Sequence, residues 1–493
     1  MATEKLMGQY THQKFDEQIQ KSNLKILYYN WVQFDNEKKE GGGVNIYQKN
    51  LIDYLVKNTN NEIYFLSSGW KYDPIKKHPY IRQTQNIYKE KCHSFEIVNS
   101  TVMAPAFAIY MYPQKFNEDT GTYEILDKFI QEHGHFDVIH FNNIEGISIN
   151  VLKLKEKYPN TKFIVSIHNY QPICPLVQYF QNHNNVICNN FDEGKECVNC
   201  SLNKPSKKEY YKRSRNYYYD ILIGNKKIFR LPFKLMCKLF KYRSKRYIGS
   251  EKTMLPEQYA YYRKHNIEML NKYADYILAV SDKVRQIMLE QGCNPNKVIT
   301  SYIGTKFAEN ELKHSVAIIT KPFTIAYLGY ERVDKGFFFF IDSLSKLDKE
   351  IAKNINVVLA VSKIHKENYE TQLKNFNKVI VYNGYTHEKL PSILKDVNLG
   401  IVPVLWEDNL PQVAIEMVAL GVPILCSSFG GASELCTSDL FKFEGGNETA
   451  FLNQLTNFVN NPDLLNEYWN HHPDLTTMEK HILEINSIYK GEI

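Results

Sequence analysis

Long apolar runs are absent from this sequence. None reaches the ~18 residues that a helix needs to span a bilayer, and residues 1–23 lack the apolar core of a secretory signal. We therefore expect a cytoplasmic protein. Nine cysteines, an odd number with several in apolar segments, are typical of a reducing compartment and not of a disulfide framework.

Charge of one sign is not in large excess either. The chain has 60 Lys and Arg against 54 Asp and Glu, a net charge of +6, so the distribution of charge is more informative than its sum. The apolar content is ordinary, which indicates a globular protein. At 493 residues the chain is too long for one ordinary core, and two large domains are expected.

Two ligand-binding motifs are also missing, since the sequence has no D-x-D and no G-x-G-x-x-G. Instead, the glycines Gly41–Gly43 stand between a predicted strand, Leu24–Asn30, and a predicted helix, Val44–Val56. Strand, glycine turn and helix form the opening of a dinucleotide-type domain. A flexible hairpin tip is the alternative interpretation of these glycines.

Strand and helix patterns alternate along the rest of the chain. This alternation predicts parallel, doubly wound sheets, in which ligands bind beyond the carboxyl ends of the strands. Further strands are expected at Ile63–Leu66, Phe95–Val98, Phe136–Asn142, Lys162–His168, Tyr276–Ser281, Val298–Tyr302, Phe323–Gly329, Asn356–Val361 and Lys378–Tyr382. Further helices are expected at Tyr123–His133, Gly146–Tyr158, Met269–Asp275, Asp282–Glu290, Phe337–Leu347 and Glu388–Leu394.

The segment from Ile401 to Leu435 carries the most informative pattern. It predicts a strand (Ile401–Leu405), a helix (Gln412–Leu420), a second strand (Val422–Cys426), a glycine turn and the start of another helix at Ala432–Leu435. Asp408 precedes the first helix and Glu416 lies on it. Carboxylates can accept hydrogen bonds from sugar hydroxyls, and a helix N-terminus offers N–H groups to a phosphate. Alternatively, Gln412 and Glu416 form a solvated stripe.

This segment resembles the nucleotide-sugar site of the family 4 glycosyltransferases. Those enzymes have the GT-B fold and an acid–seven residues–Glu motif followed by a Gly-Gly turn, here Gly430-Gly431. Trp406, Asn409 and Pro411 fit one version of the motif. The resemblance implies that Glu416 holds the ribose of the nucleotide and that Asp408 contacts the transferred sugar. The first acid of the family is normally Glu, and Glu407 stands next to Asp408.

Three other stretches carry the same resemblance. SIHNYQPICP, with His168 in third place, is similar to a family signature on the sugar or acceptor side, although Asn169 replaces the usual Asp. Lys335-Gly336 matches the element that holds the donor diphosphate; Tyr330 occupies its Arg position, and Arg332 is the candidate substitute. By the same resemblance, Gly42 and Gly43 lie against the sugar and phosphate, Gly384 and Tyr385 receive the base, and Asn409 joins the donor site. A structural role is the alternative for His168, and a surface loop for the charges near Lys335.

The predicted fold class is α/β with GT-B architecture: two Rossmann-like doubly wound parallel-sheet domains facing across a cleft. We expect an N-terminal tail (1–23), an acceptor-side domain (24–302), a linker (303–322), a nucleotide-sugar-binding domain (323–475) and a C-terminal helix that crosses back onto the first domain (476–493).

Two features fall outside the resemblance to the donor site. Cys197-Val-Asn-Cys200, with Cys174 and Cys188, has four thiols that could hold a structural zinc; reduced thiols in a loop are the alternative. Residues 204–246 contain fifteen Lys or Arg against two acids, interleaved with aromatic residues. Such a stretch can lie on an anionic membrane surface. A solvated basic surface is the alternative, and no nucleic-acid motif accompanies it.

The resemblance implies a retaining transfer of a sugar from a nucleoside-diphosphate donor, of which UDP-sugars are the most frequent in the family, to a hydroxyl of a glycan or lipid-linked acceptor. No metal and no other cofactor is expected, and the implied setting is cell-surface polysaccharide biosynthesis. A non-catalytic GT-B subunit that binds a partner transferase or glycan, and a nucleotide-sugar epimerase or hydrolase, are the alternatives.

Overall fold

A computed structural model describes residues 22–35, 41–73, 76, 78–102, 104, 113–200, 255–309, 322–362, 369, 371–436, 438–470 and 475–492, together with isolated positions between 215 and 239. Nearly all of the expected N-terminal tail, most of the basic stretch 204–246 and residues 310–321 of the expected linker lie outside the described residues. Within the described residues, no helix is both long enough and apolar enough to cross a membrane.

The N-terminal half forms an eight-stranded sheet with the order β10-β9-β6-β5-β1-β2-β4-β3. All neighbours are parallel except the pair of β3 with β4. The strands are β1 (Lys25–Asn30), β2 (Glu62–Lys71), β3 (Tyr80–Thr84), β4 (Cys92–Val98), β5 (Val138–Phe141), β6 (Lys162–Ile167), β9 (Tyr276–Ala279) and β10 (Val298–Thr300). Sequence analysis missed β3, an edge strand whose side chains are mostly half-buried and carry no apolar run.

The helices of this half are α2 (Gly42–Asn58), α4 (Pro113–Glu118), α5 (Gly121–His133), α6 (Leu154–Lys157), α7 (Lys195–Asn199), α10 (Pro256–Tyr273) and α11 (Asp282–Glu290). The predicted helices agree with α2, α5 and α11, α4 and α7 were not predicted, and the helix expected at Met269–Asp275 is only the end of the longer α10. The helix expected over Gly146–Tyr158 is wrong in its first part. Gly146 adopts a positive φ of 84°, Ser148 caps a 3₁₀ turn, η2 (Ile149–Lys153), and only α6 is α-helical. A left-handed residue cannot continue a right-handed helix.

The C-terminal half forms a six-stranded, fully parallel sheet with the order β13-β12-β11-β14-β15-β16. Its strands are β11 (Phe323–Tyr330), β12 (Ile355–Ser362), β13 (Lys378–Asn383), β14 (Leu399–Val402), β15 (Ile424–Ser427) and β16 (Lys442–Phe443). The strand expected to reach Leu405 ends at Val402, because Pro403 has no N–H to continue the ladder. Each half is therefore a doubly wound α/β domain.

The helices of the C-terminal half are α12 (Phe337–Ser345), α13 (Lys349–Ala352), α14 (Leu390–Leu394), α15 (Gln412–Ala419), α16 (Glu448–Asn460), α17 (Glu467–Asn470) and α18 (Met478–Lys490), with 3₁₀ turns η8 (His387–Lys389) and η9 (Gly431–Leu435). The helix start expected at Ala432–Leu435 is the 3₁₀ turn η9. The α15 N-cap is Pro411, one residue before the helix.

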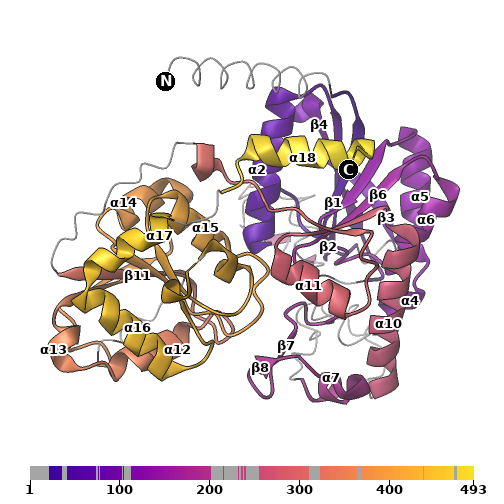
Figure 1. Cartoon of the computed structure of the whole chain (residues 1–493). Helices are drawn as coiled ribbons and strands as arrows, with labels where there is room; N and C mark the ends of the chain where they lie inside the picture. The colour runs from indigo at the N-terminus through magenta and orange to yellow at the C-terminus, as the bar shows by residue number, and fades with distance from the viewer. Residues whose placement is uncertain are drawn as a thin grey trace.

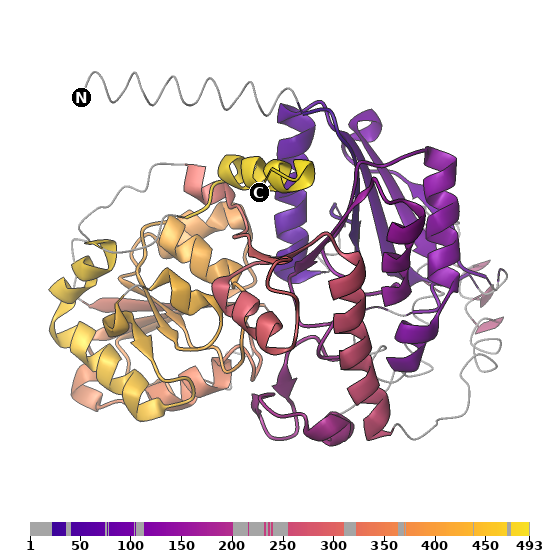
Figure 2. The ribbon, with the colours of Figure 1, turned by 45° about the vertical axis from the view of Figure 1, so that its right-hand side comes forward.

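The two domains lie side by side, and α18 joins them by returning to the first domain. Figures 1 and 2 both show this helix, in yellow, against the indigo helix α2. The contact is partly polar: the hydroxyl of Tyr47 on α2 lies 2.6 Å from Nε2 of His481, and the hydroxyl of Tyr489 lies 2.6 Å from Nδ1 of His140 on β5. The last helix therefore packs on the first domain, as its predicted crossing requires.

Candidate functional site

The candidate site is a cavity of about 1300 Å³ lined by both domains. Near the carboxyl ends of the N-terminal strands, Tyr29 of β1, Phe141 of β5 and Val165 of β6 lie side by side. His168, which follows β6 directly, lies at this edge of the sheet and lines the cavity. Nine of the residues predicted from the sequence line it: Gly42, Gly43, His168, Lys335, Gly384, Tyr385, Asp408, Asn409 and Glu416. Arg332, Gly336, Gly430 and Gly431 are not among the lining residues.

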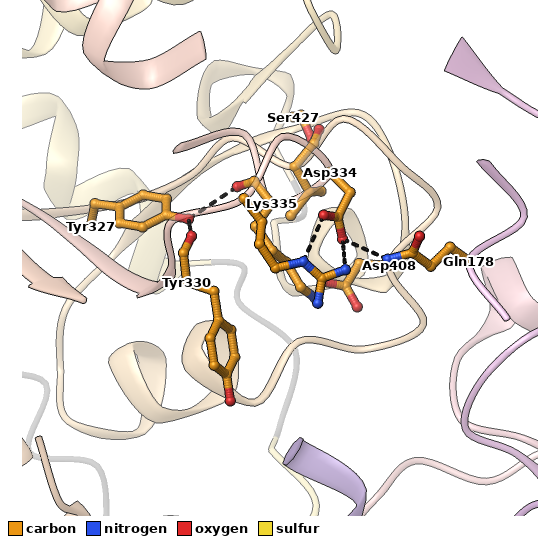
Figure 3. Close-up of polar contacts among 9 residues, drawn as sticks. Gln178, Tyr327, Tyr330, Asp334, Lys335, Asp408 and Ser427 are labelled. Carbon is orange, nitrogen blue, oxygen red and sulfur yellow. Dashed lines mark hydrogen bonds and ion pairs between the residues drawn. The ribbon is translucent and has the colours of Figure 1, made fainter. Parts of the chain in front are cut away.

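A lysine–aspartate pair forms one wall of the cavity. Lys335 precedes the N-terminus of α12, and its Nζ lies 2.5 Å from Oδ2 of Asp408 and 4.7 Å from the centre of the Trp406 ring. Figure 3 shows the two side chains reaching toward each other across the β11–α12 turn. An ammonium group has three donors, so Lys335 can keep its bond to Asp408 and still donate to an incoming phosphate oxygen.

Glu416 forms a second wall. It lies on the buried face of α15 with 2% of its surface exposed, and its Oε1 is 3.1 Å from Nδ1 of His387 in η8. Sequence analysis missed His387, because nothing in the local pattern of residues 385–389 links this turn to a helix more than twenty residues further along. Tyr385 lies beside this pair; burial, with Glu416 next, raises the pKa of its phenol.

The two neighbouring acids point to different places, which decides the register of the motif. Glu407 turns away from the cavity: its Oε2 accepts the N–H of Gly430 at 2.7 Å and its Oε1 lies 3.3 Å from Nζ of Lys283 on α11. Asp408 is the acid that lines the cavity. The pair at the site is therefore Asp408 and Glu416.

The three predicted glycines outside the cavity support its loops instead of bordering a ligand. Gly336 is the N-cap of α12 with φ 71°, and a Cβ there would lie 1.7 Å from the carbonyl oxygen of Pro403. A Cβ on Gly430 or Gly431 would lie 2.3 Å from the backbone of Asp408 or Asn409, respectively. Glycine is required because these segments run in direct backbone contact.

Arg332, the candidate substitute for the motif arginine, is engaged elsewhere. Its guanidinium group forms two hydrogen bonds with Asp334, at 2.9 and 2.7 Å. Asp334 also accepts a 3.2 Å hydrogen bond from Gln178 of the N-terminal domain, as Figure 3 shows. Tyr330, which stands in the motif Arg position, lines the cavity, and its carbonyl accepts a hydrogen bond from the hydroxyl of Tyr327.

His168 presents a neutral imidazole to the cavity. Its ring lies against Tyr47, with ring centres 5.0 Å apart. Burial, with His481 next, lowers its pKa to about 3. Nε2 is buried and has no hydrogen-bond partner among the described residues. The ring borders the cavity and carries no positive charge at neutral pH.

The four cysteines considered for zinc lie buried near the side chain of Arg263. In the part of the chain that the structure describes, no group of three or more His, Cys, Asp or Glu side chains is placed to hold a metal ion. The buried guanidinium of Arg263 lies 3.5 and 3.8 Å from the sulfurs of Cys188 and Cys197. Burial raises the pKa of Cys197 and Cys200 to about 12 and also raises that of Cys174, so these are protonated thiols.

Comparison with known proteins agrees with this architecture. Residues 308–471 match the profile of the family described as Glycosyl transferases group 1, whereas no curated protein sequence matches the chain. Similar solved structures include sucrose-phosphate synthase from Thermosynechococcus elongatus (12% identity, 95% of this chain and 99% of that chain, TM-score 0.56). The lipopolysaccharide outer core galactosyltransferase WaaB is another (12%, 95% and 100%, 0.54), as is HepE from Anabaena in complex with UDP (11%, 94% and 95%, 0.51).

The fold and the matched segment define a glycosyltransferase with the GT-B fold. The segment similar to the group 1 glycosyl transferases, residues 308–471, carries the Lys335–Asp408 pair and Glu416.

Proposed function

We propose that the protein transfers a sugar from a nucleoside-diphosphate sugar, taken to be a UDP-sugar, to a hydroxyl of a glycan or lipid-linked acceptor, with retention of configuration. The observation that carries the proposal is a cavity between two domains in which a buried carboxylate, Glu416, and a lysine–carboxylate pair, Lys335 and Asp408, face the same space. HepE, one of the similar structures, was solved with UDP.

In this proposal the C-terminal domain binds the donor. Glu416 accepts hydrogen bonds from the ribose hydroxyls, in competition with His387. Gly384 and Tyr385 lie beside Glu416 at the end of β13, where the base would be received. Lys335, at the start of α12, donates to the diphosphate together with the N–H groups of the helix N-terminus. Asp408 receives the hydroxyls of the sugar.

Catalysis would follow from charge stabilisation and positioning. As the bond to the sugar breaks, negative charge grows on the diphosphate, and Lys335 is placed to stabilise it. The leaving phosphate takes the proton of the acceptor hydroxyl, so no enzyme nucleophile is required. His168, which lines the cavity, orients the sugar or acceptor. Gly43 approaches Gln412 of α15 closely, so the two domains together limit access of water to the donor.

The decisive experiment is calorimetry with a panel of nucleoside diphosphates and their sugars. We expect micromolar binding of one nucleotide by the wild type and its loss in Glu416→Ala. Glu444→Ala removes an exposed carboxylate of the same domain and should bind like the wild type. Absence of binding by every nucleotide would overturn the enzyme proposal in favour of a non-catalytic subunit. Turnover of the donor alone would favour an epimerase or hydrolase.

We further propose that the protein works at the cytoplasmic face of a membrane in surface-polysaccharide synthesis. Leu231, Leu235 and Leu239 occupy helical positions four residues apart and are exposed by 72, 60 and 69%. They lie within the stretch of fifteen basic residues, and each basic residue near anionic lipid contributes about 1 kcal/mol. Flotation with vesicles of anionic lipid tests this. Binding should fall in the triple Leu→Ser variant and be absent with neutral vesicles; equal binding to both vesicles contradicts the proposal.

A further inference from the structure

The residues on both sides of Asp408, Glu407 and Asn409, contact the N-terminal domain. On one side, Glu407 lies 3.3 Å from Nζ of Lys283. On the other side, the backbone carbonyl of Asn409 accepts a 2.7 Å hydrogen bond from the hydroxyl of Ser281, and its side-chain amide lies 3.4 Å from the carbonyl of Ile167. The contacts on both sides therefore come from the N-terminal domain.

The partner surface is the N-terminus of α11. Ser281 caps this helix, because its side chain also accepts the N–H of Val284. Glu434 of η9 reaches the same helix end, where its carboxylate accepts the N–H groups of Asp282 and Lys283 at 3.0 and 2.7 Å. A carboxylate at this position is favoured by the partial positive charge of the helix N-terminus. Figures 1 and 2 show α11, in pink, lying against the orange C-terminal domain.

Asp408 itself faces the cavity and Lys335, and its position follows from its two neighbours. The Glu407 side chain is 9% exposed and that of Lys283 is 31% exposed, so the pair is partly removed from water. Without Lys283, the carboxylate of Glu407 would keep only the N–H of Gly430 and would lose its contact with the N-terminal domain. Asp408 follows Glu407 directly, so we expect this loss to loosen the orientation of Asp408.

We propose that Lys283 is a positioning residue: through Glu407 it sets the orientation of Asp408, so that sugar recognition depends on contact between the domains whereas nucleotide binding does not. This inference rests on the proposed function, in which Asp408 receives the sugar and Glu416 the nucleotide. Neither Lys283 nor Glu407 lines the cavity. The effect must therefore appear in the sugar-dependent part of binding and in turnover.

The test compares Lys283→Met with Lys283→Arg and with Lys272→Met. Lys272 forms a more exposed 3.1 Å ion pair with Glu156 within the N-terminal domain, so its loss removes a lysine charge that does not join the domains. Affinity is measured by calorimetry for UDP and for the UDP-sugar that the wild type binds, and donor hydrolysis is measured without acceptor.

We expect Lys283→Met to leave UDP affinity within about twofold and to lower the gain in affinity provided by the sugar, and the rate of hydrolysis, about tenfold or more, since truncating a partly buried charge pair typically has an effect of this size. Lys283→Arg should keep most of the gain in affinity provided by the sugar and most of the rate of hydrolysis. Equal loss of UDP and UDP-sugar affinity, or no change in either, would overturn the inference.

Small-angle scattering without ligand separates this inference from the proposed function. The radius of gyration should be larger for Lys283→Met than for the wild type and Lys272→Met, because the domains separate more readily. An unchanged radius overturns the role of Lys283 in domain contact. If the wild type binds no nucleotide but the radius still grows, the proposed function fails while the contact between the domains stands.

Discussion

Three imidazoles, two buried and one half-buried, lie where the N-terminal sheet meets α18, and each is kept neutral. His140 has the Tyr489 hydroxyl 2.6 Å from Nδ1 and the Ser166 hydroxyl 2.7 Å from Nε2, and His481 contacts the hydroxyl of Tyr47. Burial lowers the pKa of His168 to about 3, that of His481 to about 4 and that of His140 well below its usual value. The packing around His168 therefore keeps its ring neutral in the site.

This burial predicts a loss of stability in mild acid. The histidines of the unfolded chain take up protons near the ordinary His pKa of about 6.5, whereas those of the folded chain stay neutral down to pH 4 or 3. The contribution of the three histidines to the free energy of unfolding is therefore complete above pH 6.5 and falls as the pH drops below that value. The slope is at most about 1.4 kcal/mol per pH unit for each histidine. Urea denaturation between pH 7.5 and 5 measures it.

His481→Gln should reduce the change of the free energy of unfolding with pH by the share of one histidine, because glutamine does not titrate. Glutamine can still form a hydrogen bond with the Tyr47 hydroxyl. His135→Gln changes an exposed histidine and should leave the slope unchanged. A slope that is the same in wild type and His481→Gln would contradict the buried, neutral state of His481.

At the scale of elements, the turns that precede or end the helices decide where site residues lie. Gly336 and Gly384 both have positive φ values, 71° and 79°, but their surroundings differ. A Cβ at Gly336 would collide with the carbonyl of Pro403, whereas nothing lies within 4 Å of a Cβ at Gly384. Gly336 is therefore required by both its backbone conformation and the lack of space, whereas Gly384 is required by its backbone conformation alone.

Gly336→Ala should therefore destabilise the protein by more than about 3 kcal/mol, since the β14 end and the start of α12 must separate. Gly384→Ala should cost only about 1–2 kcal/mol for the left-handed conformation. Thermal unfolding of the two variants side by side checks the order. Equal midpoints would contradict the close contact of Gly336 with Pro403.

At the scale of the whole molecule, α18 ties the end of the chain to the core of the first domain. The Tyr489 hydroxyl bonds to His140 and lies 3.2 Å from the hydroxyl of Tyr28. Tyr489→Phe leaves a buried nitrogen of His140 without its partner, at a cost of about 1–3 kcal/mol. Its unfolding midpoint should fall, while that of Tyr261→Phe, which changes an exposed tyrosine, should not. An unchanged midpoint in Tyr489→Phe would show that this contact adds nothing.

Much of the architecture could be predicted from the sequence because it is encoded locally. Apolar periodicity predicted α11 at its observed bounds and α12 and β12 nearly so, and the family resemblance predicted Asp408 and Glu416, which both line the cavity. Two of the predictions that failed also have local causes. Edge strand β3 has no apolar run, and positive-φ Gly146 delays the helix expected to start there.

Local sequence patterns and the family resemblance were sufficient to predict the two-domain α/β order, the return of the last helix and nine of the residues that line the cavity. The contacts of Glu407 with Lys283, of Arg332 with Asp334 and of His387 with Glu416 became visible only in the folded chain. The physical reason is range: helix, strand and turn preferences act over a few neighbours. The partner of a charged side chain is set by which distant segments the folded sheets bring within a few ångströms of it.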